Sequence, residues 1–518
     1  MNTFLQRHLS SVTGMLSGFD RVRVRGTFRM LAHKGGFASF LKIIGIKLQD
    51  FGQWVEQSTD LLRRQTERTA QAAGRPVKYL SSPSISKEDV ARQIAAEDGI
   101  KRGLICVLSA TEPCFSYHVR QHGSPQLGGG TRRCLHYYHY MIDPYFGFMH
   151  VRVQSWMPMV MHICINGREW LARRMDEAGM KYQRVDNCFL QLSDPEAAQK
   201  LFDGMLRTNW PRELNRLAKA ANPASERILA NCRQDYYWSV EESEWASDVM
   251  FKSPALLKEV YPNLVRHGML GLGSRDVLRF LGRKPHQNLQ AEVSTDLRRR
   301  VEGLRIKHRV ATNSIKMYDK QGSVLRVETT INKPRDMKVY RPKEGDEKGE
   351  KDWRYLRKGV ADTYRRAQIC QAANERYLDA MAAVDDPTPL GKLVDDLCRP
   401  VKYKGPKAKK SRQVRALNPL AKEDATLLEA VSRGEFTLTG FRNKDIRALL
   451  FTGKARDPRD SRRRSGAVTR KLRLLRAHGL IRKMPRTSRY IISDQGRVQI
   501  TALLAARAAN TAKLAAAA

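Results

Sequence analysis

The chain has 518 residues and a large excess of positive charge, with 93 Lys and Arg against 53 Asp and Glu, or +40 at pH 7. Hydrophobic residues make up 42% and charged residues 28%, a globular composition for a chain of about two to four domains. Such a charge attracts polyanions. Because no 18-residue stretch is free of charge and the first 30 residues lack a signal-peptide core, we expect nucleic acid as the partner and no membrane.

The eight cysteines are scattered and form no Cys-x-x-Cys pair. This spacing is unlike a zinc ribbon and predicts no metal site of that kind. Buried, reduced thiols in a cytoplasmic protein are the simplest interpretation.

Residues 1–100 are predicted to combine a basic strand with helices. Arg21, Arg23 and Arg25 alternate with two valines, so the three guanidinium groups share one face of a strand. We expect this face to contact nucleic acid. Helical patterns follow over 37–44 and 51–62.

Residues 101–395 are predicted to form a central α+β body. Apolar runs and alternation indicate strands at 104–108, 134–140, 146–155 and 159–165, and Asn166-Gly167 indicates a turn before a helix at 169–175. Residues 190–285 are predicted to be mostly helical. A long helix is expected over 353–383.

Basic and aromatic residues alternate between Arg132 and Tyr140. Arg132, Arg133 and Tyr138 fit a sheet surface on which the bases of a single strand stack. A core sheet with satisfied histidines explains the same residues equally well. The segment lacks the His-apolar-His pair of one large class of nicking enzymes, because two residues separate His136 from His139.

Four acidic residues gather between Glu241 and Asp248 in a chain where acids are scarce. On a helix, Glu241, Glu244 and Asp248 would share one face. They would either hold a metal ion or offset a basic neighbour, and we favour the second interpretation.

Residues 316–331 are predicted to form a hairpin that turns at Gln321-Gly322. The stretch from Tyr318-Asp319-Lys320 to Leu325-Arg326-Val327-Glu328 resembles rolling-circle replication initiators of filamentous phages and small plasmids. The resemblance covers about 20 residues and implies Tyr318 as a DNA-nicking nucleophile, with Glu328 and Asp319 near Mg²⁺ or Mn²⁺. The alternative is a half-buried hairpin whose Arg and Glu pair across the sheet.

From Arg399 to the end, the chain has 30 Lys and Arg against 8 Asp and Glu. Residues 396–419 lack apolar periodicity and are predicted to be a solvated basic linker. Helical patterns follow at 420–433, from a cap at Asn443, and at 467–478 behind a cap at Ser465. A basic loop, 459–464, precedes the third helix. A hairpin at 480–484 and 489–492 and a closing helix at 495–506 complete the segment.

Three helices followed by a hairpin with a basic tip is the order of a winged helix-turn-helix domain, placed here at 420–510. The pattern Leu-Leu-x-x-x-Gly-Leu-Ile, Arg-Tyr and Asp-x-Gly over about 70 residues resembles MarR-like transcriptional regulators. The resemblance implies that the third helix enters the major groove of duplex DNA. The predicted DNA-binding residues are Arg462, Arg463, Arg464, Thr469, Arg470, Lys471, Arg473, Lys483, Arg486 and Arg489.

The sequence lacks a phosphate-binding Gly-x-x-x-x-Gly-Lys-Ser/Thr loop, a His-Glu-x-x-His pair and a nucleophile-elbow serine. The predicted fold class is α+β, with a central antiparallel sheet and a C-terminal winged helix. The predicted function is DNA binding, with RNA or single-strand contacts by the body. A metal-dependent tyrosine nicking enzyme of a mobile element is the alternative. The oligomeric state, including a homodimer, is left open.

Overall fold

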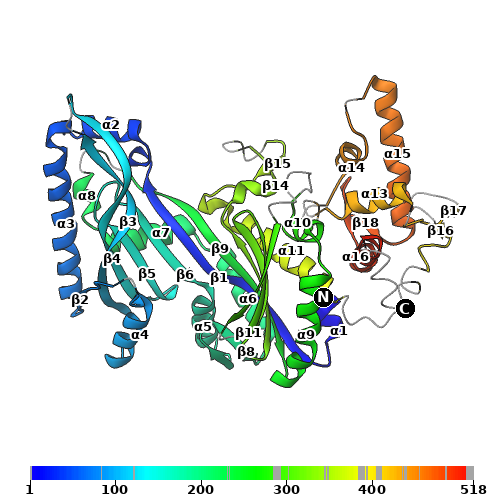
Figure 1. Ribbon diagram of the computed structural model, residues 1–518, viewed down its shortest axis with the longest axis horizontal. Helices are drawn as coiled ribbons and strands as arrows, with labels where there is room; N and C mark the ends of the chain where they lie inside the picture. Colours follow the sequence, from blue (N-terminus) through cyan, green and yellow to red (C-terminus); the bar gives the residue numbers. More distant parts are fainter. Residues whose placement is uncertain are drawn as a thin grey trace.

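The computed structural model describes residues 3–508 except for 83, 121–122, 230–231, 233, 284–292, 301–302, 344–345, 347–348, 383–390, 392–394, 404–410, 420, 434–435, 437–439, 454 and 485–486. Helices and strands both make up much of the chain, which confirms the α+β class (Figure 1). Within the described segments, no helix combines the length and apolar character that crossing a bilayer requires.

One large sheet of eleven strands organises the body, and its order is β10-β11-β12-β13-β9-β1-β6-β5-β4-β3-β2. The β2–β3 pair is parallel and the other neighbouring pairs are antiparallel. In sheet order the strands span Val293–Arg300, Gly303–Val310, Asn313–Lys320, Val324–Ile331, Tyr236–Phe251, Val12–Phe28, Met161–Asn166, Gly147–Gln154, Gln126–Asp143, Gly103–Arg120 and Val77–Tyr79.

Strand β1 lies near the middle of this sheet, between β9 and β6. Its Arg–Val alternation was predicted correctly, and the strand extends well beyond the alternating residues. The segments predicted as 1–100 and 101–395 therefore share one sheet and one hydrophobic core.

Strand β9 corrects the prediction that residues 190–285 are mostly helical. It runs from Tyr236 to Phe251 and pairs with β1 and β13. Glu241, Glu244 and Asp248 consequently lie on a strand rather than on one face of a helix. The pairing with β1 joins residues more than 200 positions apart, which local periodicity does not report.

The sheet has one apolar face and one charged face, both partly covered by helices. Six helices pack on the apolar face: α2 (Lys34–Ile43), α3 (Phe51–Ala72), α7 (Trp210–Ala221), α9 (Pro254–Leu270), α10 (Ser274–Phe280) and α11 (Thr363–Ala382). Three helices pack on the opposite face: α4 (Lys87–Glu97), α5 (Gly167–Glu177) and α6 (Pro195–Asp203). Tyr137 joins the core beneath α3, whereas Tyr138 joins the small core beneath α4. On the charged face, Arg21 and Arg23 of β1 are exposed.

Two further predictions of local structure were wrong. Asn166 does not form a turn with Gly167; its side chain accepts hydrogen bonds from the amides of Arg168 and Glu169 and caps α5. The helix predicted from 353 begins at Thr363. The residues before it form the strand β15 (Asp352–Tyr355), which pairs with β14 (Lys338–Arg341).

The described residues between 397 and 508, here called the C-terminal module, have a hydrophobic core of their own. Its elements are β16 (Val401–Tyr403), β17 (Arg412–Val414), α13 (Lys422–Val431), α14 (Asn443–Leu450), α15 (Pro458–Ala477), β18 (Ile481–Lys483), β19 (Tyr490–Ile492) and α16 (Asp494–Ala508). Leu397 and Leu417 are buried in this core, and β16 pairs with β17. The predicted linker 396–419 is thus structured where it is described.

Helix α15 is longer than predicted. Asp457 caps it by accepting the amide of Asp460, and Pro458 occupies its first turn. The predicted basic loop 459–464 is therefore helical, and Ser465 lies inside the helix. Asn443 is also not a cap; it is the first residue of α14, and its amide donates to the carbonyl of Ser465.

Candidate nucleic-acid interface

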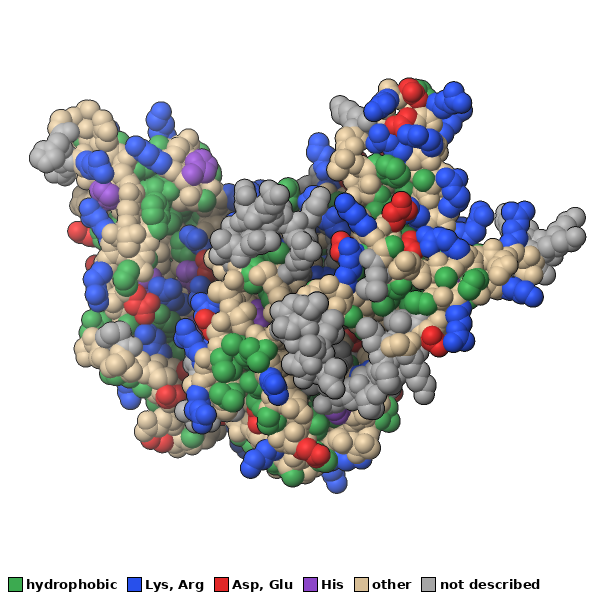
Figure 2. Space-filling model, turned by 45° about the vertical axis from the view of Figure 1, so that its right-hand side comes forward, with side chains coloured by type: hydrophobic (Ala, Val, Ile, Leu, Met, Phe, Trp, Pro, Cys, Tyr) green, Lys and Arg blue, Asp and Glu red, His purple; other side chains and the backbone are tan. Residues whose placement is uncertain are grey.

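Helix α15 presents a basic stripe along its exposed side. Val468, Leu472 and Leu475 are buried against the module core. Turned away from that core are exposed residues at helical spacing, namely Arg459, Arg462, Arg463, Arg470 and Arg473. The Arg463 side chain is 80% exposed. In Figure 2, Lys and Arg side chains are concentrated on the C-terminal module, at the upper right.

The β18–β19 hairpin lies next in the chain, and a short third strand extends it. Phe441 and Tyr490 exchange backbone hydrogen bonds of 2.9 and 2.8 Å, so residue 441 pairs with the returning strand. Arg482 and Lys483 are exposed on β18. The predicted contact Arg486, at the tip, lies outside the described residues.

A hollow of about 180 Å³ lies between α14 and the first turns of α15. Lys444, Arg447 and Arg464 line it, and no acidic side chain does. Arg464 is held there by Asp460 at 2.7 Å and by the carbonyl of Gly453 at 3.1 Å. The hollow thus adds positive charge beside the α15 stripe.

Besides Arg463 and Arg464, which pair with Asp460, three predicted contacts on the module are engaged within the protein. Arg489 is 7% exposed, donates to the carbonyl of Gly440 at 2.8 Å and stacks over the Tyr340 ring of the body at 4.1 Å. It therefore joins the module to the body. Lys471 lies 3.5 Å from Glu423, and the Thr469 hydroxyl accepts from Asn443 at 2.9 Å.

On the body, the β1 arginines point to the open charged face, as predicted. The side chains of Arg21, Arg23 and Arg25 are 49%, 52% and 39% exposed. Carboxylates of β9 hold them: Arg21 lies 3.2 Å from Glu242 and from Glu244. Glu241 lies 3.3 Å from Arg23 and 3.7 Å from Arg25. These glutamates offset basic neighbours, which is the interpretation favoured from the sequence.

The basic row continues past the end of β1. The Arg29 guanidinium lies over the Tyr237 ring at 4.6 Å, and that ring is 41% exposed. Sequence reasoning missed this pair, since Tyr237 falls in a stretch that looked helical. An exposed aromatic ring beside guanidinium groups is a surface on which a base can stack.

The Arg132–Tyr140 segment separates into an exposed and a buried part. Arg132 and Arg133 are exposed on β4. Tyr138 is 8% exposed and donates to Glu112 at 2.7 Å, so it is a core residue and not an open stacking platform. His136 and His139 are buried, and burial lowers the pKa of each to about 4.

Tyr318, Glu328 and Lys316 form a compact group on β12 and β13. Tyr318 is 7% exposed and donates to Glu328 at 3.0 Å, while Lys316 Nζ lies 2.6 Å from the other carboxylate oxygen. Burial, and then the charge of Glu328, raise the pKa of Tyr318 well above its usual value. Asp319 points to the other face of β12 by strand alternation. No cluster of three or more His, Cys, Asp or Glu suited to a metal ion occurs in the part of the chain that the structure describes.

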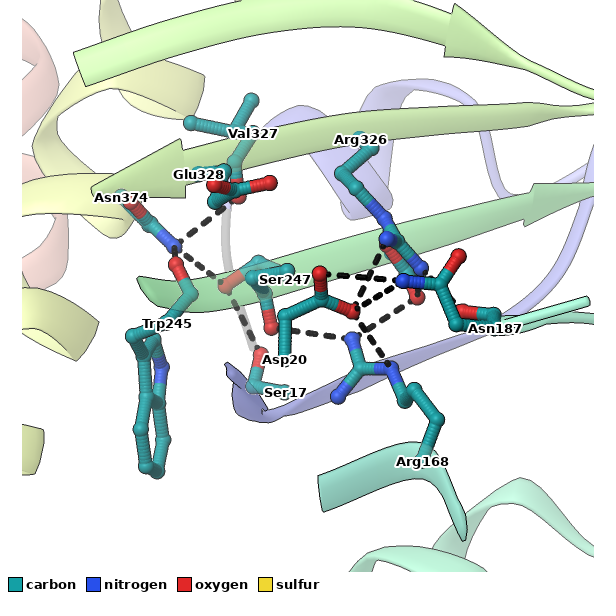
Figure 3. A network of polar contacts seen from close by, with 12 residues as sticks. Ser17, Asp20, Arg168, Asn187, Trp245, Ser247, Arg326, Val327, Glu328 and Asn374 are labelled. Carbon is teal, nitrogen blue, oxygen red and sulfur yellow. Dashed lines mark hydrogen bonds and ion pairs between the residues drawn. The ribbon is translucent and has the colours of Figure 1, made fainter. Parts of the chain in front are cut away.

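A buried ion network lies beside this group, beneath α5 (Figure 3). Arg326, which is fully buried, donates to Asp248 at 2.6 and 2.8 Å and to Asp20 at 3.0 Å. Arg168 donates to Asp248 at 2.8 Å, and Asn187 donates to Asp20 at 3.0 Å. Arg326 thus pairs with β9 and β1, and not with Glu328 as the hairpin alternative supposed.

The chain matches no protein-family model, no curated protein and no solved structure.

Proposed function

We propose that the protein binds duplex DNA through its C-terminal module, which we interpret as a winged helix. The observation that carries the proposal is the exposed basic stripe of α15 beside the basic hairpin β18–β19. The order of α13, the Phe441 strand, α14, α15 and the hairpin agrees with that domain type.

In this proposal α15 enters the major groove and the hairpin contacts the sugar–phosphate backbone. Arg470 and Arg473 supply guanidinium groups that can donate to base edges or phosphates. Lys444 and Arg447, in the hollow beside α15, neutralise adjacent phosphates. Arg482 and Lys483 do the same from the hairpin.

We further propose that the open face of the body sheet binds single-stranded nucleic acid or RNA. Arg21, Arg23 and Arg25 lie two residues apart along β1 and point the same way, and the Arg29–Tyr237 pair follows. The neighbouring glutamates preorganise the arginines, and such exposed ion pairs are weak enough for phosphates to compete with them.

The nicking alternative is not proposed. Its nucleophile would be Tyr318, whose hydroxyl is buried and donates to Glu328. A phenol in this position has neither access to a phosphodiester nor a lowered pKa.

A gel mobility-shift assay with duplex DNA tests the proposal. We expect the double variant Arg470→Ala/Arg473→Ala to bind at least about tenfold more weakly than the wild type. Arg212→Ala removes an 80% exposed arginine from α7, on the body, and is the matched control with unchanged affinity. Equal affinities of all three proteins, or no binding by any, would overturn the proposal.

A further inference from the structure

Two of the cysteines lie together on the β3–β4 hairpin, although they are distant in the sequence. In the register of this hairpin Cys114 pairs with Arg132, and Glu112 pairs with Cys134. The two cysteines are therefore diagonal neighbours on one face of the hairpin. The Cys114 thiol donates a hydrogen bond to Cys134, and the Cys134 backbone amide donates to the Cys114 sulfur. Both residues are half-buried, and neither is in a disulfide.

The hairpin is a two-stranded ribbon at this point (Figure 1). In the part of the chain that the structure describes, β2 pairs with residues 107–109 of β3, and β5 pairs with β4 from His136 onward. Cys114 and Cys134 lie beyond these pairings, where β3 and β4 are paired with each other alone. Such a ribbon twists more readily than the middle of a wide sheet. The strands can therefore make the short approach that brings two contacting sulfur atoms to about 2.05 Å, the length of a disulfide bond.

The surroundings of Cys134 favour its thiolate. The hydrogen bond from Cys114 lowers the pKa of Cys134 to about 7, although burial opposes it, and the charge of Arg132 acts in the same direction as the hydrogen bond. The hydrogen bond and burial together raise the pKa of Cys114. One sulfur of the pair is thus ready to ionise near neutral pH, while the other keeps its proton.

The acidic residue nearest to the pair in the hairpin has its own partners. Glu112, opposite Cys134 in register, lies 3.1 Å from Lys87 and 3.0 Å from Arg152. The sequence has no Asp or Glu from 113 to 142. Thiolates, rather than thiols, are the nucleophiles, and reactive cysteines lie in partly exposed, positively charged surroundings of this kind. A reactive cysteine that acts as a redox sensor commonly has a second, resolving cysteine beside it.

We propose that Cys134 and Cys114 are a dithiol that hydrogen peroxide oxidises to a reversible disulfide. The Cys134 thiolate attacks one peroxide oxygen, the O–O bond breaks, hydroxide leaves, and Cys134 becomes a sulfenic acid. The Cys114 sulfur then attacks the sulfenic sulfur, and the S–S bond forms as the Cys114 proton and the sulfenic hydroxyl leave as water. The two sulfurs together lose two electrons, which reduce the peroxide. Thiol reductants reverse the reaction by disulfide exchange.

Peptide mapping of the full chain, first reduced and then treated with hydrogen peroxide, tests the proposal. Tryptic peptides 103–120 and 134–152 should become joined through Cys114 and Cys134, and reduction should separate them. The first peptide also contains Cys106, which is fully buried, and fragmentation shows which cysteine is linked. Cys398→Ser removes an exposed cysteine of the C-terminal module and is the control that should keep the link. Absence of the link, or a link through Cys106, would overturn the proposal.

Two variants test the order of the steps. In Cys114→Ser the sulfenic acid has no resolving thiol, so dimedone should label Cys134 more strongly than in the wild type. Cys134→Ser should form neither the link nor the dimedone adduct at this pair. Labelling of Cys114 in Cys134→Ser, with none of Cys134 in Cys114→Ser, would overturn the assigned roles. Circular dichroism shows whether each variant is folded, and the wild-type link does not depend on either variant.

The rate of alkylation against pH measures the ionisation of Cys134 directly. Iodoacetamide should modify Cys134 at half its maximal rate near pH 7 in the folded chain. In the urea-denatured chain the same cysteine should reach this point at about pH 8.5, as an ordinary thiol does. Cys114→Ala should raise the value for the folded chain, because Cys134 loses its hydrogen-bond donor. Equal values for the folded and the denatured chain would contradict the proposal. None of these experiments depends on nucleic-acid binding.

Discussion

Tyr318 donates a hydrogen bond to Glu328 across the β12–β13 hairpin, with 3.0 Å between the phenol oxygen and the carboxylate. Lys316 approaches the same carboxylate at 2.6 Å from the neighbouring position on β12. The residues that resemble a nicking site therefore pair with one another inside the sheet, through a hydrogen bond and an ion pair to Glu328. This arrangement gives them a structural role, because a buried carboxylate needs such partners.

We predict that Tyr318→Phe lowers the free energy of unfolding by about 1–3 kcal/mol, because Glu328 loses a buried donor. Duplex affinity should stay unchanged. Denaturant unfolding and a mobility-shift assay measure the two effects. A covalent protein–DNA adduct that forms with Mg²⁺ or Mn²⁺ and disappears in Tyr318→Phe would instead establish the nicking alternative.

The ionisation of Asp248 should make the stability of the protein depend on pH in the acidic range. Burial alone would raise the pKa of this carboxyl, but Arg326 and Arg168 outweigh burial and hold it below its usual value. A lowered folded-state pKa stabilises the protein above the unfolded value of about 3.9, and this stabilisation is lost as pH falls through the folded-state pKa.

The matched variant for that prediction is Asp248→Asn. At neutral pH it should be less stable than the wild type by about 3–5 kcal/mol, because two arginines lose a buried counter-ion. Below about pH 4 the difference should shrink, as the wild-type carboxyl takes up a proton. Urea unfolding at several pH values measures this, and a difference that is constant with pH contradicts it.

Substitutions of Arg489 and Arg482 should have different effects, although both residues belong to the predicted hairpin at 480–484 and 489–492. Arg489→Ala removes the stacking on Tyr340 and the bond to Gly440, and should lower stability by about 1–3 kcal/mol. Arg482→Ala, at an exposed position, should leave stability within about 0.5 kcal/mol and weaken duplex binding. The opposite pattern in melting and mobility-shift experiments would reverse these two assignments.

On the body, Arg23→Ala should weaken the binding of single-stranded nucleic acid. It should also reduce the slope of log K against log salt concentration by about 0.7, the value for one phosphate contact. Glu241→Gln should strengthen this binding and increase the slope, since Glu241 competes with phosphate for Arg23 and Arg25. Fluorescence anisotropy over a range of salt concentrations measures both. Identical slopes for both variants and the wild type would exclude the β1 face as the binding surface.

Local patterns predicted the elements whose partners are close in the sequence. The Lys316–Ile331 hairpin, the Arg21–Arg25 strand and the hairpin after Gly479 were all found near their predicted positions. In each case alternation, turn residues or a C-terminal glycine identify the element without its tertiary partners.

What depends on distant contacts could not be predicted. Strand β9 looked helical because its acids recur at helical spacing, and its pairing with β1 has no local signal. Arg326 of β13 meets Asp20 of β1 and Asp248 of β9 only after these three strands assemble. The start of α15 was different, because Asp457-Pro458 is a recognisable helix start in the sequence, a capping aspartate followed by proline.

The most direct test of DNA binding by α15 is the salt dependence of duplex affinity for the wild type and Arg470→Ala/Arg473→Ala. If both arginines contact phosphates, the slope of log K against log salt should fall by about 1.8, or 0.9 for each contact. If they contact bases, affinity should fall and sequence preference should relax with little change of slope. Unchanged affinity, slope and sequence preference would contradict the account, because α15 would then not touch DNA.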